Sequence, residues 1–356
     1  MHFSSDNWAG CHPAIAENLN RHAGGFSAGY GNGELDLKVT DRLREIFECD
    51  LDVFFVSTGT AANSLSLASF QRPGGVIFAY NEAHVIVDEC GAPHFLSGSM
   101  RLSPISGKNG KMDIKMLADS VSALANASVH QGRPAGITIT QSSETGTVYS
   151  LYELDAIAAI ARSHNLPLHM DGARFANALV ALDVSPAEMT WKRGVDLLSF
   201  GATKNGCWCA EAIVVFDRSH TEELRWLQKR SAQLFSKTRF IAAQFDAYLA
   251  NDLWLKNARH ANAMGQALAR AIEAAPGMRL TVQPQANEIF AVLENSLAQR
   301  LRNAGAFFYD WETPPELKGN VSTDETVCRF VTSFATTQDD IDRFAAVIGA
   351  EAIAAQ

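Results

Sequence analysis

The chain has 356 residues, 47% of them hydrophobic, so it exceeds the size at which a single core usually stops growing, and we expect two domains. The formal charge of −9 comes from 39 acidic and 30 basic residues, and no run of lysine or arginine forms a patch for nucleic acid or a membrane surface. Neither nucleic acid nor a membrane is therefore expected as a partner.

The amino-terminal segment MHFSSDNWAG lacks the basic stretch and apolar run of a secretory signal, and no later segment is apolar for long enough to cross a bilayer. Six cysteines occur without a CxxC pair or a zinc-like spacing to histidine. Free thiols are typical of a reducing compartment, so we expect a cytoplasmic protein. Because no Asp, Glu and His ligands cluster, we expect no catalytic metal.

Short apolar runs alternate with helical patterns along the first two thirds of the chain. The expected strands lie at 53–56, 76–80, 137–140, 166–170, 195–200 and 213–216. Between two of them, the segment 151–164 places leucine and alanine residues on one face and is typical of an amphipathic helix. This alternation predicts an α/β fold with a mostly parallel sheet wrapped by helices.

The segment 241–275 is rich in alanine, has one internal glycine and is followed by Pro276-Gly277, which predicts one long helix. We place the domain junction inside this helix, with a large domain at 1–250, including an amino-terminal arm, and a small domain at 251–356. The later segments MRLTV, NEIFAVL, AFFYDW and TVCRFVT, with a final helix at 337–349, predict that the small domain is α+β.

The segment DVFFVSTGTAAN predicts a strand, a turn that contains Gly59 and Thr60, and then a helix. Backbone N–H groups and hydroxyls at a helix N-terminus bind anions such as phosphate. Ordinary N-capping explains the same residues, so this pattern alone leaves both interpretations open.

Two later segments each place a charged side chain directly after a buried strand. In NLPLHMDGARFANAL, Asp171 ends the strand and Arg174 follows, either at the functional edge of an α/β sheet or as a local ion pair. In VDLLSFGATKNG, Lys204 lies on a glycine-flanked turn, whereas most lysines lie on solvated helix faces. Alone, Lys204 could be an ordinary loop residue.

Together, a phosphate-binding turn, an aspartate and a lysine in this chain order match what pyridoxal 5′-phosphate (PLP) requires in proteins of fold type I. Nearly end to end, the chain also resembles the low-specificity L-threonine aldolases, which are grouped with the aromatic amino acid β-eliminating lyases. The motifs that carry this resemblance are SDN, GYGN, STGTAAN, EAHVIVDECGAP, HMDGARFANA, FGATKNG and CRFVTSF.

The resemblance implies a cofactor-binding role at several positions, of which Arg174 and Arg239 are described with the substrate and subunit contacts. Lys204 would bind PLP covalently as an imine, and Asp171 would pair with the pyridine nitrogen. Gly59 and Thr60 would hold the phosphate, and His84 would stack on the ring. An aspartate at the pyridine nitrogen keeps this nitrogen protonated, so the ring can accept electrons released at Cα.

The resemblance also implies contacts with the substrate and with a second subunit. Arg329 and Ser5 match positions that bind the substrate carboxylate, and Arg174 should lie near this carboxylate or the phenolic oxygen of PLP. Arg239 matches an arginine that reaches a phosphate, across a subunit interface. Tyr30, in a glycine-rich loop, could line the site or the dimer contact, or could simply be a turn residue.

The general base stays open between three candidates. His84 could take a proton as well as stack, because imidazole titrates near neutral pH. In ITITQSSETGTVY this chain has Glu144 where many aldolases of the family have a histidine. Glu144, His84 or a bound water could therefore serve.

The implied reaction is the retro-aldol cleavage of L-threonine, L-allo-threonine or a related β-hydroxy-α-amino acid such as phenylserine to glycine and an aldehyde. A homodimer or homotetramer with active sites at the subunit interface is expected with it. The alternatives on the same fold are β-elimination and amino transfer. A protein of another class, a scaffold without catalysis, would have no evident need for Lys204, Asp171 and Arg329 together.

Overall fold

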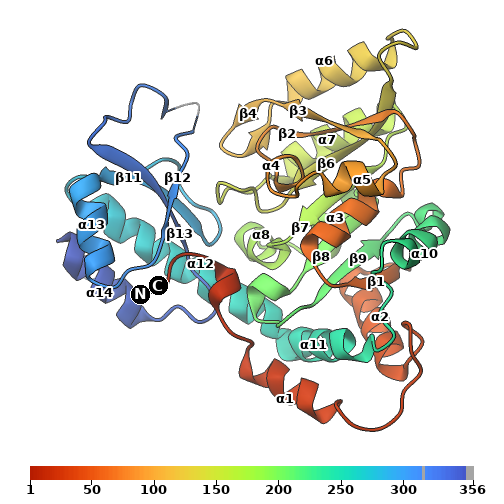
Figure 1. Ribbon diagram of the computed structural model, residues 1–356, viewed down its shortest axis with the longest axis horizontal. Helices are drawn as coiled ribbons and strands as arrows, with labels where there is room; N and C mark the ends of the chain where they lie inside the picture. The colour runs from red at the N-terminus through yellow and green to blue at the C-terminus, as the bar shows by residue number, and fades with distance from the viewer. Residues whose placement is uncertain (315–316, 350–356) are drawn as a thin grey trace.

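The computed structural model describes residues 1–314 and 317–349 of the chain. It has two lobes, each built on its own sheet (Figure 1). The hydrophobic core of the large lobe draws on residues from Ile15 to Ala258. That of the small lobe draws on Met264 to Ile348 and on two residues near the amino terminus, Met1 and Phe3.

Within the described residues, the large lobe contains a seven-stranded sheet in the order β1-β9-β8-β7-β6-β2-β3. Only β9 runs antiparallel to its neighbours, so the prediction of a mostly parallel sheet is confirmed. The strands of this sheet are β1 (Asp52–Val56), β2 (Gly75–Tyr80), β3 (Arg101–Ile105), β6 (Arg133–Thr140), β7 (Leu168–Gly172), β8 (Leu197–Gly201) and β9 (Glu211–Val215). A small hairpin joins β4 (Gly107–Lys108) to β5 (Lys111–Met112).

The central strands β7, β8 and β9 are buried along their whole length, which explains their nearly continuous apolar sequence. The helices of the large lobe are α1 (Pro13–Arg21), α2 (Glu34–Phe47), α3 (Gly59–Ala68), α4 (His84–Val87), α5 (Ala92–Leu96), α6 (Ile114–Ala125), α7 (Leu151–Ser163), α8 (Phe175–Leu182), α9 (Pro186–Met189), α10 (Thr221–Arg230) and α11 (Arg239–Leu249). The predicted amphipathic helix is α7, which starts with a capping box between Ser150 and Glu153.

Short 3₁₀ turns connect several of these elements. They are η1 (Asp6–Trp8), η2 (Trp191–Arg193), η3 (Thr203–Asn205), η4 (Arg218–His220) and η5 (Ala250–Asp252).

The prediction of one continuous helix from 241 to 275 is wrong. Helix α11 ends at Leu249, the turn η5 follows, and α12 runs from Leu253 to Ala274. Asn251 and Asp252 have φ values of 51° and 56°, in the left-handed region that Asn and Asp enter more readily than most residues. The break separates a helix packed on the large lobe from the helix that leads into the small lobe (Figure 1).

The small lobe has a four-stranded antiparallel sheet in the order β10-β11-β13-β12, with helices α13 and α14 beside it. Its elements are β10 (Met278–Leu280), β11 (Glu288–Glu294), α13 (Asn295–Asn303), β12 (Tyr309–Trp311), β13 (Glu325–Val331) and α14 (Gln338–Ile348). The amino-terminal arm packs here: His2 pairs with Phe307, and Phe3 is fully buried. The predicted boundary near residue 250 stays a prediction, and residues 350–356 of the predicted small domain lie outside the described residues.

Among the described residues, no helix is both long and apolar enough to cross a membrane. The same residues hold no group of three or more His, Cys, Asp or Glu side chains arranged to bind a metal ion.

Candidate active site

The candidate residues gather at one edge of the large sheet, where the parallel strands end. The turn after β1 leads to Gly59 and Thr60, the turn after β2 to His84, and the loop after β6 to Glu144. Asp171 lies at the end of β7, and Lys204 follows β8. In open α/β sheets the carboxyl ends of the strands form the ligand-binding edge, so the topology explains why residues far apart in sequence meet here.

Lys204 lies in the turn η3, which the surrounding structure holds in place. The side-chain amide of Asn205 donates to the Tyr248 hydroxyl (2.8 Å) and to the Trp254 carbonyl (2.9 Å), and the Asn257 amide donates to the Asn205 carbonyl (2.9 Å). The amine of Lys204 itself forms no hydrogen bond or ion pair with any described residue. A rigid turn thus presents a half-buried amine whose donors are all available.

Asp171 is buried, and each of its carboxylate oxygens accepts one hydrogen bond. The donors are Nδ2 of Asn63, at 2.8 Å, and the backbone N–H of Ala173, at 2.9 Å. The local ion pair between Asp171 and Arg174, one of the two sequence-based interpretations, does not form. Since a carboxylate oxygen can accept more than one hydrogen bond, Asp171 can take a further donor.

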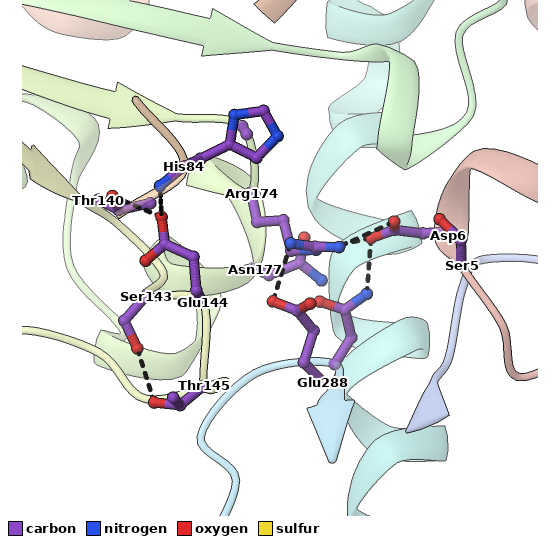
Figure 2. A network of polar contacts seen from close by, with 12 residues as sticks. Ser5, Asp6, His84, Thr140, Ser143, Glu144, Thr145, Arg174, Asn177 and Glu288 are labelled. Carbon is purple, nitrogen blue, oxygen red and sulfur yellow. Dashed lines mark hydrogen bonds and ion pairs between the residues drawn. The ribbon is translucent and has the colours of Figure 1, made fainter. Parts of the chain in front are cut away.

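Arg174 instead joins the large lobe to the arm and the small lobe (Figure 2). Its Nε and Nη2 donate to the two carboxylate oxygens of Asp6, at 2.7 and 3.0 Å, and its Nη1 lies 2.8 Å from Oε2 of Glu288. Burial alone would lower the pKa of Arg174, but the two carboxylates raise it above its ordinary value. Its guanidinium is therefore committed to protein carboxylates.

Glu144 and His84 are in direct contact (Figure 2). Oε1 of Glu144 accepts from the backbone N–H of His84 at 2.8 Å and from the Thr140 hydroxyl at 3.0 Å. Its Oε2 is shielded from solvent and has no hydrogen-bond partner among the described residues. Burial raises the pKa of this carboxyl to about 7. Glu144 can consequently exchange a proton near neutral pH.

A second carboxylate, that of Glu89, contacts the imidazole ring of His84. Its Nδ1 lies 2.8 Å from Oε1 of Glu89, and this hydrogen bond raises the pKa of His84. The side chain of Glu89 is fully buried. Asn63 donates to the same Oε1 at 2.8 Å as well as to Asp171. The sequence interpretation missed Asn63 and Glu89, although both lie inside the motifs STGTAAN and EAHVIVDECGAP.

Arg329 and Ser5 lie near each other, across the junction of the arm and the small lobe. Nη2 of Arg329 donates to the Ser4 carbonyl at 3.2 Å, and its Nε is buried without a partner among the described residues. The guanidinium lies over Trp311, with its central carbon 4.4 Å from the ring centroid. Burial lowers the pKa of Arg329. The structure thus holds an arginine with at least one unused donor against the arm segment that carries Ser5.

Arg239 and Tyr30 lie together on a different part of the surface. Nη1 of Arg239 donates to the carbonyls of Gly24 and Gly25, at 3.1 and 3.0 Å. Tyr30 is exposed, has a φ of 59°, and is held through its backbone N–H by the Ser236 carbonyl at 3.2 Å. No contact within the described chain brings either residue to Lys204.

Two further titratable groups of the large sheet were not singled out from the sequence. Glu211 begins β9, and burial raises its pKa to about 7, while Lys204 acts to lower it. His169 is fully buried between the hydroxyls of Thr138 and Ser199, at 2.9 Å each, and burial lowers its pKa to about 4. Neither lies in a spacing pattern that would have marked it in the sequence.

The match to known proteins extends over most of the chain. A family model described as β-eliminating lyase matches residues 2–296. The chain is 40% identical over 307 residues to a low specificity L-threonine aldolase from Pseudomonas aeruginosa, across 86% of this chain and 88% of that protein. A low specificity L-threonine aldolase from Pseudomonas sp. (strain NCIMB 10558) is 39% identical over the same coverage.

A solved structure of a threonine aldolase from Leishmania major matches with a TM-score of 0.89 and 28% identity, and covers 98% of each chain. The fold and its edge of charged residues therefore define a lyase of fold type I. The chain belongs to the β-eliminating lyase family.

Proposed function

We propose that this protein uses PLP to cleave L-threonine, L-allo-threonine and related β-hydroxy-α-amino acids, phenylserine among them, to glycine and an aldehyde. One observation carries the proposal. In a chain 40% identical to a low specificity L-threonine aldolase, the amine of Lys204, unpaired among the described residues, shares a sheet edge with the buried carboxylate of Asp171.

The residues at this edge fit PLP. The backbone N–H groups of Gly59 and Thr60 have no acceptor among the described residues, and the space beside Gly59 is open, as a phosphate requires. Asp171 has a lone pair that could accept from the protonated pyridine nitrogen of PLP. Lys204 has a free amine that could react with the aldehyde group of PLP. When bound, PLP supplies a ring that accepts the electrons released at Cα.

The substrate carboxylate is assigned to Arg329 with Ser5. The unused Nε of Arg329 and its Nη groups form the planar fork that grips a carboxylate with two hydrogen bonds. Such a grip fixes rotation about the bond between nitrogen and Cα and so selects which Cα bond breaks. Arg174 then acts by holding Asp6 and Glu288 beside this site.

The proton of the β-hydroxyl needs an acceptor, and two titratable side chains lie at this edge. The carboxyl of Glu144 has a pKa of about 7 and a free Oε2, and the pKa of His84 is raised by Glu89. Either side chain, or a water held between them, can accept the proton at neutral pH.

A homodimer or homotetramer with active sites at the interface completes the proposal. Phe26 is fully exposed in the loop that Arg239 holds, and Tyr30 is exposed in the same loop. This loop, with Tyr30 in it and Arg239 beside it, would reach the site of a second copy. The six free cysteines support a cytoplasmic location. The two hydrophobic cores support a large and a small domain, with the change from one core to the other between Ala258 and Met264 of α12.

Proton NMR of the products tests the reaction, with separate samples of L-threonine, L-allo-threonine and phenylserine incubated with the protein and PLP. Glycine with the matching aldehyde is expected. Formation of 2-oxobutyrate from threonine would instead establish elimination, and amino transfer to an added keto acid would establish an aminotransferase. No product together with no change in PLP absorbance on mixing would indicate a protein without catalysis.

A further inference from the structure

The function proposed above uses Glu89 only through its effect on the pKa of His84, although the carboxylate of Glu89 contacts the His84 ring directly. Glu89 follows α4 in the chain, and its side chain is fully buried. Its Oε1 receives two contacts of 2.8 Å, from Nδ1 of His84 and from Nδ2 of Asn63. A buried carboxylate costs free energy unless it is paired, so this arrangement calls for a role.

The first contact determines the state of the His84 ring. An ionised Glu89 can only accept, so Nδ1 of His84 must carry the hydrogen of this bond. In the neutral ring the lone pair then resides on Nε2. Fixing one ring nitrogen in this way also fixes the plane of the ring.

The second contact connects the pair to Asp171. The two hydrogens on Nδ2 of Asn63 are directed to Oε1 of Glu89 and to Oδ2 of Asp171, at 2.8 Å each. Asn63 lies on α3, the helix whose first residues are Gly59 and Thr60. One amide therefore holds both carboxylates at set positions relative to the phosphate-binding turn.

We propose that Glu89 is a positioning residue, which holds the His84 ring through Nδ1 and makes Nε2 the nitrogen available to the substrate, while Asn63 ties this pair to Asp171. The inference rests on the proposed function, because that function assigns His84 to the reaction site.

The charges around His84 agree with this role. Its pKa is raised by the hydrogen bond that the ring donates to Glu89 and by the charges of Asp171 and Glu89, against the opposing effects of burial and of Lys204. Glu144 faces the backbone N–H of His84 rather than its ring. Glu89 thus supplies the ring's direct carboxylate contact.

The test uses the protein without PLP, so it does not depend on turnover. Nitrogen NMR of ¹⁵N-histidine-labelled protein reports the pKa and tautomer of each ring, and the His84 signals are those missing from His84→Asn. Glu89→Gln removes the charge but keeps an oxygen that can accept from Nδ1. Glu89→Leu removes both. The matched control is Asp196→Asn, a half-buried carboxyl that accepts from the Leu168 N–H at the opposite edge of the sheet.

The expected wild-type ring is protonated on Nδ1 when neutral. Glu89→Gln should keep this tautomer and lower the His84 pKa by about one unit or more, as expected for the loss of a contacting charge. Glu89→Leu should lose the tautomer preference, and Asp196→Asn should change neither property.

A wild-type neutral ring protonated on Nε2 would overturn the proposal, as would an unchanged His84 pKa in Glu89→Gln. If Glu89→Leu fails to fold, the tautomer of His84 in the wild-type protein and the His84 pKa in Glu89→Gln still test the proposal. If these NMR results hold but the wild-type protein forms no glycine, the proposed function fails while the positioning of His84 stands.

Discussion

The raised pKa of Glu144 predicts that this residue destabilises the folded protein as the pH rises. An unfolded glutamate has a pKa near 4.5, and burial raises that of Glu144 to about 7. The folded state therefore binds this proton more tightly than the unfolded state. The stability that this proton contributes is fully present below pH 4.5 and is lost as the pH rises through 7.

The size of the effect follows from the shift of about 2.5 units, which at about 1.4 kcal/mol per unit amounts to about 3 kcal/mol. Of this, roughly 2 to 3 kcal/mol develops between pH 5 and pH 8. Glu144→Gln cannot lose a proton, so it should gain stability relative to wild type by that amount across this range. The constant cost of an amide at the buried Oε2 position cancels in the comparison between pH values.

Urea unfolding of the protein without PLP, at several pH values between 5 and 8, measures the difference. Glu153→Gln is the control, because hydrogen bonds from Lys111 and Ser150 lower the pKa of Glu153, so it stays ionised in both states over this range. The difference in unfolding free energy between Glu153→Gln and wild type should therefore stay constant from pH 5 to pH 8. Parallel pH profiles for wild type and Glu144→Gln would refute the reasoning about burial.

Three further predictions concern the charged residues of the site. Lys204→Ala should retain no covalent PLP after borohydride reduction, seen by mass spectrometry, and should lose about a thousandfold or more in turnover. Arg174→Ala leaves Asp6 and Glu288 buried without their cation, so urea unfolding should show a loss of about 3 to 5 kcal/mol. Arg329→Lys loses the planar fork, and steady-state kinetics should show a KM for L-threonine raised about 10- to 100-fold; an unchanged KM would place the carboxylate elsewhere.

Much of the fold could be predicted from the sequence, because a buried parallel strand has a continuous apolar sequence whatever its neighbours are. The segments 76–80, 166–170 and 195–200 were recognised in this way and overlap β2, β7 and β8. The helix break at Asn251 and Asp252 was missed, because apolar periodicity continues on both sides of two residues in left-handed conformation. Tertiary packing selects that conformation, because Leu249 before the break and Trp254 after it both pack into the core of the large lobe.

The site was predictable where a residue's chemistry is linked to its position on a strand, as for Asp171 and Lys204. It was not predictable where contacts join distant segments. The sequence left the partner of Arg174 open, and the structure pairs it with Asp6, 168 residues away, and with Glu288 of the small lobe. The carboxylate of Asp171 lies only three residues from Arg174 in the sequence. The strand geometry directs this carboxylate toward Asn63 instead.

By itself, the sequence determined the α/β class, most strands of the large sheet and a set of candidate site residues, because burial patterns and reactive side chains are local properties. Only the tertiary structure decided the chain of contacts from Asp171 through Asn63 and Glu89 to His84, and the commitment of Arg174 to two carboxylates. Hydrogen bonds and ion pairs act over a few ångströms, so they depend on which segments the fold brings together.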